Sequence, residues 1–191
     1  MKWRLGVLAG IALAFSTFST HADGTHTVTV QANIDRWQDS GVSVVAGQTL
    51  VLTATGLTHP DEFSYTDANA VGNSANGPFP GYGTEPGSIV PTTVYCSLIG
   101  KVGGDANVGT GILLPEGAPG KGPGFVGTSY EQVIPNSGEL FFAYNDAINF
   151  ADNTGAYTVT FSVPEPTSIV PLAILGMVVV GRRSRRLGRF D

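Results

Sequence analysis

Apolar and polar residues alternate in several short stretches of the chain, and this period of two is typical of β-strands with one buried face. The clearest stretch runs from Tyr157 to Val163, where apolar residues alternate with threonine and serine. Further strand-like stretches cover residues 28–34, 42–44, 50–54, 93–102 and 139–144. Residues 23–163 contain no convincing amphipathic helix. The pattern predicts an all-β domain folded as a single antiparallel β-sandwich.

Two longer stretches lack strand signals. Residues 57–91 are rich in Gly, Pro, Asn and Asp, and residues 103–128 are rich in glycine. Long loops on a compact sandwich are often functional or mobile, so both are candidates for carrying function.

The first 22 residues have the layout of a secretory signal peptide. Lys2 and Arg4 form a basic start, an apolar run follows from Leu5 to Phe15, and small or polar residues precede Ala22. The run is too short to span a bilayer unaided. We expect a signal helix that signal peptidase removes, with cleavage after Ala22; a buried core helix is the alternative.

The C-terminal end, residues 164–191, has three parts. A Pro-Glu-Pro motif is followed by an apolar stretch that we expect to form a short transmembrane helix over 167–181, and then by an arginine-rich tail. The apolar run from Ile169 to Gly181 would rise only about 20 Å as a helix, against about 30 Å for a hydrocarbon core. A marginal span followed by arginines favours a cytoplasmic tail and an exported body.

This tail resembles a PEP-CTERM sorting signal, with Pro164, Glu165 and Pro166 matching the family's motif. The resemblance implies recognition by an exosortase, a transient stay in the membrane, removal of the tail, and release to the cell surface or extracellular matrix. An ordinary membrane anchor after a proline-rich linker is the alternative.

Charge separates the body from the two ends. The whole chain has a net charge of −5, yet the region between residues 23 and 166 keeps only Arg36, Lys101 and Lys121 among the bases. That region holds nearly all the acids, which excludes nucleic-acid binding and favours cations. The single cysteine, Cys96, cannot form an intrachain disulfide and is interpreted as a buried small hydrophobe.

Oxygen-bearing side chains gather between the last two predicted strands. Asp146, Asp152 and Asn153 could supply side-chain oxygens, and a backbone carbonyl around Asn149 could complete the set. Oxygen ligands at irregular short spacing suit calcium. An ordinary hairpin turn needs the same residue types, so this alternative stays open. A second Asp-Asn-Gly stretch, at Asp105, is a further candidate cation loop.

The body resembles the PA-IL-like family of calcium-dependent, galactose-binding bacterial lectins, which have a small jelly-roll-like sandwich. The resemblance rests on three segments, residues 36–50, 97–103 and 141–159, and the last is the most specific. It implies that Asp146 binds calcium through both carboxylate oxygens. It also implies side-chain ligation by Asp152 and Asn153, and backbone carbonyl ligation by Asn149 and Tyr65.

The sequence departs from that family in three ways. The loop after Asp146 is one residue shorter, an aspartate replaces asparagine at 152, and the sugar-contacting His-Pro-Asp-Gln segment is absent near residues 83–86. Calcium is therefore better supported than galactose.

The leading hypothesis is a non-enzymatic, exported protein that binds a glycan or exopolysaccharide, of galactose type if the resemblance extends so far, through calcium. The alternative is a structural matrix protein in which calcium only braces the fold. A hydrolase that pairs Asp146 with Asp152 or Glu131 is a third hypothesis, although no catalytic motif supports it. Trp37 is interpreted as a core residue, with sugar stacking as its alternative.

Overall fold

The structure is a computed structural model that describes residues 24–60, 68–72, 84–147 and 149–163. The predicted signal helix, the sorting motif Pro164–Pro166, the short apolar helix and Tyr65 lie outside the described residues. Within those residues, no helix is long and apolar enough to cross a membrane.

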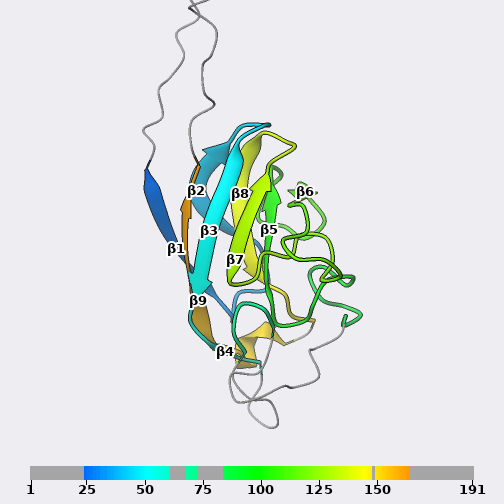
Figure 1. Cartoon of the computed structure of the whole chain (residues 1–191). Coiled ribbons are helices and arrows are strands. Elements are labelled where there is room, and N and C mark those ends of the chain that lie inside the picture. The colour runs from blue at the N-terminus through cyan, green and yellow to red at the C-terminus, as the bar shows by residue number, and fades with distance from the viewer. Residues whose placement is uncertain (1–23, 61–67, 73–83, 148, 164–191) are drawn as a thin grey trace, which may run out of the picture.

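In the described residues, nine strands and one 3-10 turn make up the regular structure (Figure 1). They are β1 Thr25–Gln31, β2 Gln38–Val44, β3 Thr49–Thr55, β4 Thr58–His59, β5 Leu98–Val102, β6 Ile112–Leu113, β7 Ser129–Val133, β8 Gly138–Tyr144, η1 Phe150–Asp152 and β9 Thr154–Ser162. The first sheet has the order β1-β9-β3-β7, with β4 also pairing with β9, and the second has the order β2-β8-β5-β6. All pairings are antiparallel, so the predicted β-sandwich is confirmed.

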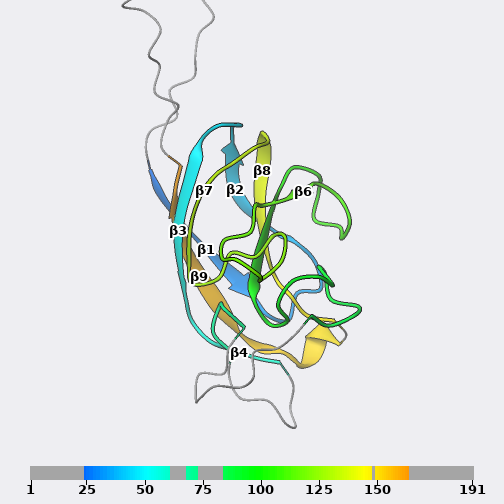
Figure 2. The ribbon, with the colours of Figure 1, turned by 45° about the vertical axis from the view of Figure 1, so that its right-hand side comes forward.

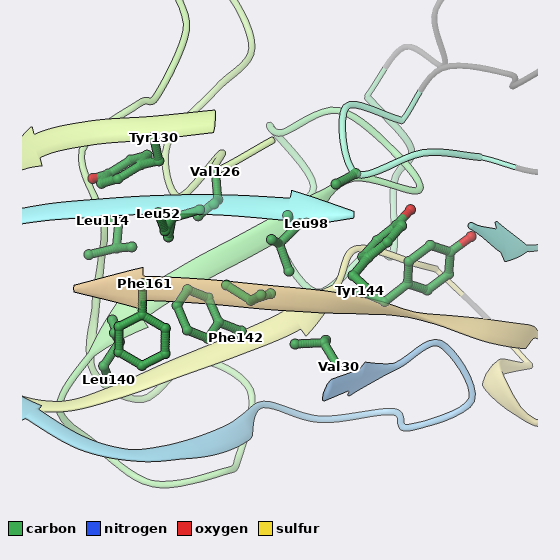
Figure 3. Packing of buried hydrophobic residues seen from close by; sticks show 14 of the residues in the cluster. Val30, Leu52, Leu98, Leu114, Val126, Tyr130, Leu140, Phe142, Tyr144 and Phe161 are labelled. Carbon is green, nitrogen blue, oxygen red and sulfur yellow. The ribbon is translucent and has the colours of Figure 1, made fainter. Parts of the chain in front are cut away.

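The core lies between the two sheets because their inward positions are apolar at a period of two (Figure 3). Leu52 and Phe161 come from the first sheet, while Leu98 and Phe142 come from the second. The Phe142 and Phe161 rings meet edge to face, with 5.7 Å between their centroids. This contact joins β8 to β9, the two strands that flank the predicted calcium loop.

A second apolar cluster covers the outer face of the second sheet. Trp37, Val90, Ile99, Phe141 and Ala143 are all buried there. Ile99, Phe141 and Ala143 alternate with inward-facing core residues along β5 and β8, so these strands are buried on both faces. Trp37 is 2% exposed and is a core residue, as predicted.

The predicted strand over 93–102 is wrong in its first half. β5 begins only at Leu98 because Cys96 has a φ of 58°, in the left-handed region that extended strands do not use. The Cys96 amide donates to the carbonyl of Asn145 at 2.8 Å, which helps hold this bend. Cys96 itself is fully buried and forms no disulfide, as expected.

The two ends of the body lie side by side. Thr25 at the start of β1 pairs with Ser162 at the end of β9. The loop between β8 and β9 precedes the opposite end of β9, near Thr154 (Figure 1). Since a strand rises about 3.3 Å per residue, the length of β9 separates the predicted site from both ends of the body by roughly 25 Å.

Candidate calcium and ligand site

The candidate site is the β8–β9 connection, and Asn145 fixes where it starts. The buried Asn145 side chain donates from Nδ2 to the carbonyls of Val90, Thr93 and Val94 at 3.0–3.2 Å. Its Oδ1 accepts a hydrogen bond from the Val90 amide at 2.9 Å. These bonds tie the loop to the segment before β5. Sequence reasoning missed this role, and the only signal was a polar residue directly after an apolar strand.

Asp146 is almost completely buried, with 1% of its surface exposed. Its Oδ1 accepts a hydrogen bond from the Ala147 amide at 2.6 Å, and its Oδ2 accepts one from Nδ2 of Asn153. The same Asn153 nitrogen donates to the carbonyl of Ala32 at 3.3 Å. The structure therefore brings together Asp146 and Asn153, two of the predicted ligands.

Asn149 and Asp152 form the outer part of the loop. Asn149 has φ 64° and ψ 41°, a left-handed conformation that asparagine tolerates better than most residues. This bend starts the η1 turn, in which the Asn149 carbonyl accepts the Asp152 amide at 3.0 Å. The Asn149 side chain donates from Nδ2 to Oδ2 of Asp152 at 2.6 Å. The turn thus brings the other two predicted ligands together.

Two oxygen atoms of this loop are buried without a hydrogen-bond partner: Oδ1 of Asp152 and Oδ1 of Asn153. A buried acceptor without a donor costs about 1–3 kcal/mol, so native proteins rarely keep one without a ligand or ion to satisfy it. The Asp146 carboxylate, whose Oδ2 accepts a hydrogen bond from Nδ2 of Asn153, adds further hard oxygens to the same loop. The residues present therefore fit a calcium ion, whose preferred ligands are such oxygens.

A larger all-carboxylate or histidine centre is absent from the described residues, since they contain no group of three or more His, Cys, Asp or Glu that could hold a metal. Amide and carbonyl oxygens would have to complete any shell here.

A shallow hollow of about 370 Å³ opens beside the loop. Its lining residues are Asn33, Asp35, Asn149, Phe150 and Ala151. The first two belong to the β1–β2 connection and the others to the η1 turn. This volume lies at the lower end of the range of small-ligand sites. Sequence reasoning did not include Asn33 and Asp35, because only the fold brings the β1–β2 connection beside η1.

β4 brings the segment before residue 61 to the same end of the molecule. His59 pairs with Thr154, directly after Asn153, and Thr58 pairs with Gly155. Gly155 has a φ of 83°, and a Cβ there would lie 2.3 Å from the Leu57 carbonyl oxygen. Glycine is therefore required for this close approach.

The second candidate cation loop, at Asp105, already contains a cation from the chain itself. Lys101 is completely buried, and its Nζ donates to the carbonyls of Asp105 and Thr110 at 2.5 and 2.8 Å. The same Nζ lies 5.1 and 5.0 Å from the ring centroids of Trp37 and Phe141. Burial lowers the pKa of Lys101, and the Asp105 charge opposes this shift. The ammonium group takes the place that a metal would need.

The carboxylate pairing of Asp146 with Glu131 is not possible in this fold. Glu131 lies opposite Val51, which in turn pairs with Ser162 at the far end of β9 from the candidate site.

Comparison with solved structures finds proteins of similar fold. No family model and no curated protein matches the chain. A solved structure described as "EclA N-terminal domain; PllA-like lectin" aligns with a TM-score of 0.50 and 17% identity. The alignment covers 73% of this chain and 96% of that chain. The body therefore shares its fold with that domain.

Proposed function

We propose that this protein is an exported, non-enzymatic module that binds a glycan through calcium held in the β8–β9 loop. The observation that carries the proposal is the pair of unpartnered, buried oxygens of Asp152 and Asn153 in the same loop as the buried Asp146 carboxylate. The lectin-like fold supports carbohydrate binding, since the similar solved domain is described as a lectin.

Each residue has a separate task in this proposal. Asp146 supplies the negative charge, and Asp152 and Asn153 supply the unpartnered oxygens. Calcium, when bound, accepts the neutral hydroxyls of a sugar in place of water. Asn145 keeps the loop attached to the segment before β5, so that Asp146 stays in position.

The hollow beside η1 supplies the second half of the ligand site in this proposal. Phe150 offers part of an aromatic ring, and Asn33 and Asp35 offer hydrogen-bonding groups for hydroxyls. A neutral sugar fits this lining better than a uronic acid, because the Asp35 carboxylate repels a second negative charge.

The β8–β9 loop lies far from both ends of the body, so it would face away from a surface to which either end is attached. Both ends of the body lie at the end of the sandwich opposite to the loop. We propose that signal peptidase removes residues 1–22 and that an exosortase processes the tail after Pro164–Pro166, so that the body reaches the cell surface or matrix.

A glycan array tests the proposal. The full chain is applied with calcium or with EDTA, together with the variants Asp146→Ala and Glu131→Gln, which each remove one negative charge. We expect retention on neutral sugars in calcium for the wild type and Glu131→Gln, and loss of retention in EDTA and in Asp146→Ala. Retention that persists in EDTA and in Asp146→Ala would contradict the proposal.

A second candidate is a matrix protein in which calcium only braces the last hairpin. The absence of the sugar-contacting His-Pro-Asp-Gln segment near residues 83–86 favours it, because the chain then lacks part of the sugar site that the family resemblance implies. In that case calcium raises the melting temperature, by the equivalent of about 2.7 kcal/mol at one hundred times the dissociation constant, while the array stays blank.

A further inference from the structure

The outer face of the first sheet is an uncovered array of hydroxyl groups. One cross-strand row consists of Thr27, Thr160, Thr53 and Ser129, and the next of Thr29, Thr158 and Thr55. We call the outward threonines and serines of this sheet the hydroxyl face; they are Thr25, Thr27, Thr29, Thr49, Thr53, Thr55, Ser129, Thr158, Thr160 and Ser162.

Nothing in the described parts of the chain covers this face. The segments 84–97 and 103–128 lie beside the second sheet, away from the outer surface of the first (Figure 2). A hollow of about 150 Å³ lies between β9 and β3, bordered by Thr53, Thr160 and Ser162 among others. The surface is therefore open to a partner and slightly concave toward the end of β9 at Ser162.

The hydroxyl face is also regular and stiff. Neighbouring strands lie about 4.8 Å apart, and successive outward residues on one strand lie about 6.7 Å apart. The face thus presents a grid in which each threonine offers one methyl and one hydroxyl group. Threonine has a restricted χ1 and loses little side-chain entropy when it becomes ordered at an interface.

The charge of the body and of the hydroxyl face indicates which kind of partner can bind. The body is strongly acidic, with three bases against 14 acids between residues 23 and 166. The rows of the hydroxyl face carry Glu131 alone as a charged side chain, at the edge strand β7. An acidic polymer would be repelled by the rest of the body, whereas an uncharged polymer meets a neutral surface. A second copy of the chain would find little apolar surface to bury, since Val51 and Val133 are the apolar side chains exposed there.

We propose that the hydroxyl face is a second, calcium-independent binding surface for a neutral polysaccharide chain. Rows of hydroxyls can exchange donor and acceptor roles with sugar hydroxyls, and the methyl groups can pack against the C–H faces of the rings. The surface is separate from the β8–β9 loop and goes beyond the function proposed for that loop.

Co-sedimentation in EDTA tests this proposal with the full chain. The probes are an insoluble neutral β-glucan and immobilised polygalacturonate, which is an acidic polymer. We expect the wild type to sediment with the neutral polymer at least about tenfold more strongly than with the acidic one. Asp146→Ala should sediment like the wild type, so the two proposals can fail independently.

Three variants locate the surface. Thr160→Glu adds a charge at the centre of the face, and Val108→Glu adds the same charge on an exposed loop outside it. Thr53→Val keeps the shape of threonine and removes a hydroxyl. We expect Thr160→Glu to lose binding by tenfold or more, Thr53→Val to lose it partly, and Val108→Glu to keep it, with all three retaining the wild-type circular dichroism spectrum.

Two outcomes would overturn the proposal. One is the absence of sedimentation with the neutral polymer in EDTA, or sedimentation that Thr160→Glu does not change. The other is a dimer of the wild type in analytical ultracentrifugation that Thr160→Glu dissociates, because the face would then be an interface between two copies of this chain.

Discussion

The two sheets of the sandwich differ in how far their outer faces are buried. In the second sheet the central strands β8 and β5 are buried on both sides, and their outer residues Ile99, Lys101 and Phe141 lie under loops, whereas the edge strands β2 and β6 are partly exposed. The first sheet is buried on one side and exposes threonine and serine on the other. In the described residues, the buried polar side chains of Lys101 and Asn145 and the loops that they hold therefore lie beside the second sheet, while the first sheet stays regular.

This difference indicates which of the two faces depends on particular side chains for its stability. A covered sheet face needs polar groups that organise the loops above it, and Asn145 and Lys101 meet that need with several hydrogen bonds each. An open face needs only side chains that tolerate water. Substitutions should accordingly have large effects near the second sheet and small ones on the outer face of the first.

The largest effect is expected for Asn145→Ala. The substitution leaves the buried carbonyls of Val90, Thr93 and Val94 without this donor, so we expect a loss of about 3–5 kcal/mol in the free energy of unfolding. Urea unfolding followed by fluorescence measures it. Asn33→Ala, an exposed asparagine in the hollow, is the control and should stay within about 0.5 kcal/mol. Equal effects of the two would contradict the account.

Lys101→Met is expected to have the next largest effect. Methionine retains much of the apolar stem, but the carbonyls of Asp105 and Thr110 lose a charged donor and the Trp37 ring loses its cation. These carbonyls can partly hydrate, so we expect about 2 kcal/mol of destabilisation in urea. A more stable variant would show that burial of the ammonium outweighs its hydrogen bonds.

Asp105 makes the stability of the loop between β5 and β6 sensitive to acid. Hydrogen bonds from the Asn107 amide, then from the Thr110 hydroxyl, lower the pKa of Asp105 below its usual 3.8. The carboxylate therefore contributes stability above pH 3.8, and that contribution is lost as the pH falls through the lower folded-state value. Thermal unfolding from pH 6 to pH 2 should show a gap between wild type and Asp105→Asn that closes in acid. A gap that stays constant over this range would contradict this interpretation.

The smallest effect is expected on the hydroxyl face. Thr53 is exposed and points outward from β3, so Thr53→Ala should change the free energy of unfolding by less than about 0.5 kcal/mol. The same urea experiment measures it. A loss of 2 kcal/mol or more would mean that the face is structurally important and would remove the contrast between the sheets.

Features that depend only on residues close together in the chain could be predicted from the sequence. β9 was predictable because its alternation follows from local geometry, and β8 because an apolar run of its length is typical of a buried strand. The candidate ligands Asp146, Asp152 and Asn153 were found because they lie close together in one loop.

Features that depend on distant segments could not be predicted in this way. The bend at Cys96 is held partly by a backbone bond to Asn145, and Lys101 is buried by Trp37 and by loop carbonyls that only the fold brings near. A lysine in a strand is ordinarily solvent-exposed. Asn33 and Asp35 were missed for the same reason, since their neighbour Asn149 lies far along the chain.

The most direct test of the central claim is calorimetric titration of calcium into the EDTA-stripped full chain. We predict one saturable site in the wild type and in the control Glu131→Gln, and no measurable binding in Asp146→Asn, which keeps the side-chain shape and removes the charge. Absence of binding in the wild type, or equal binding in wild type and Asp146→Asn, would contradict the assignment of calcium to the β8–β9 loop.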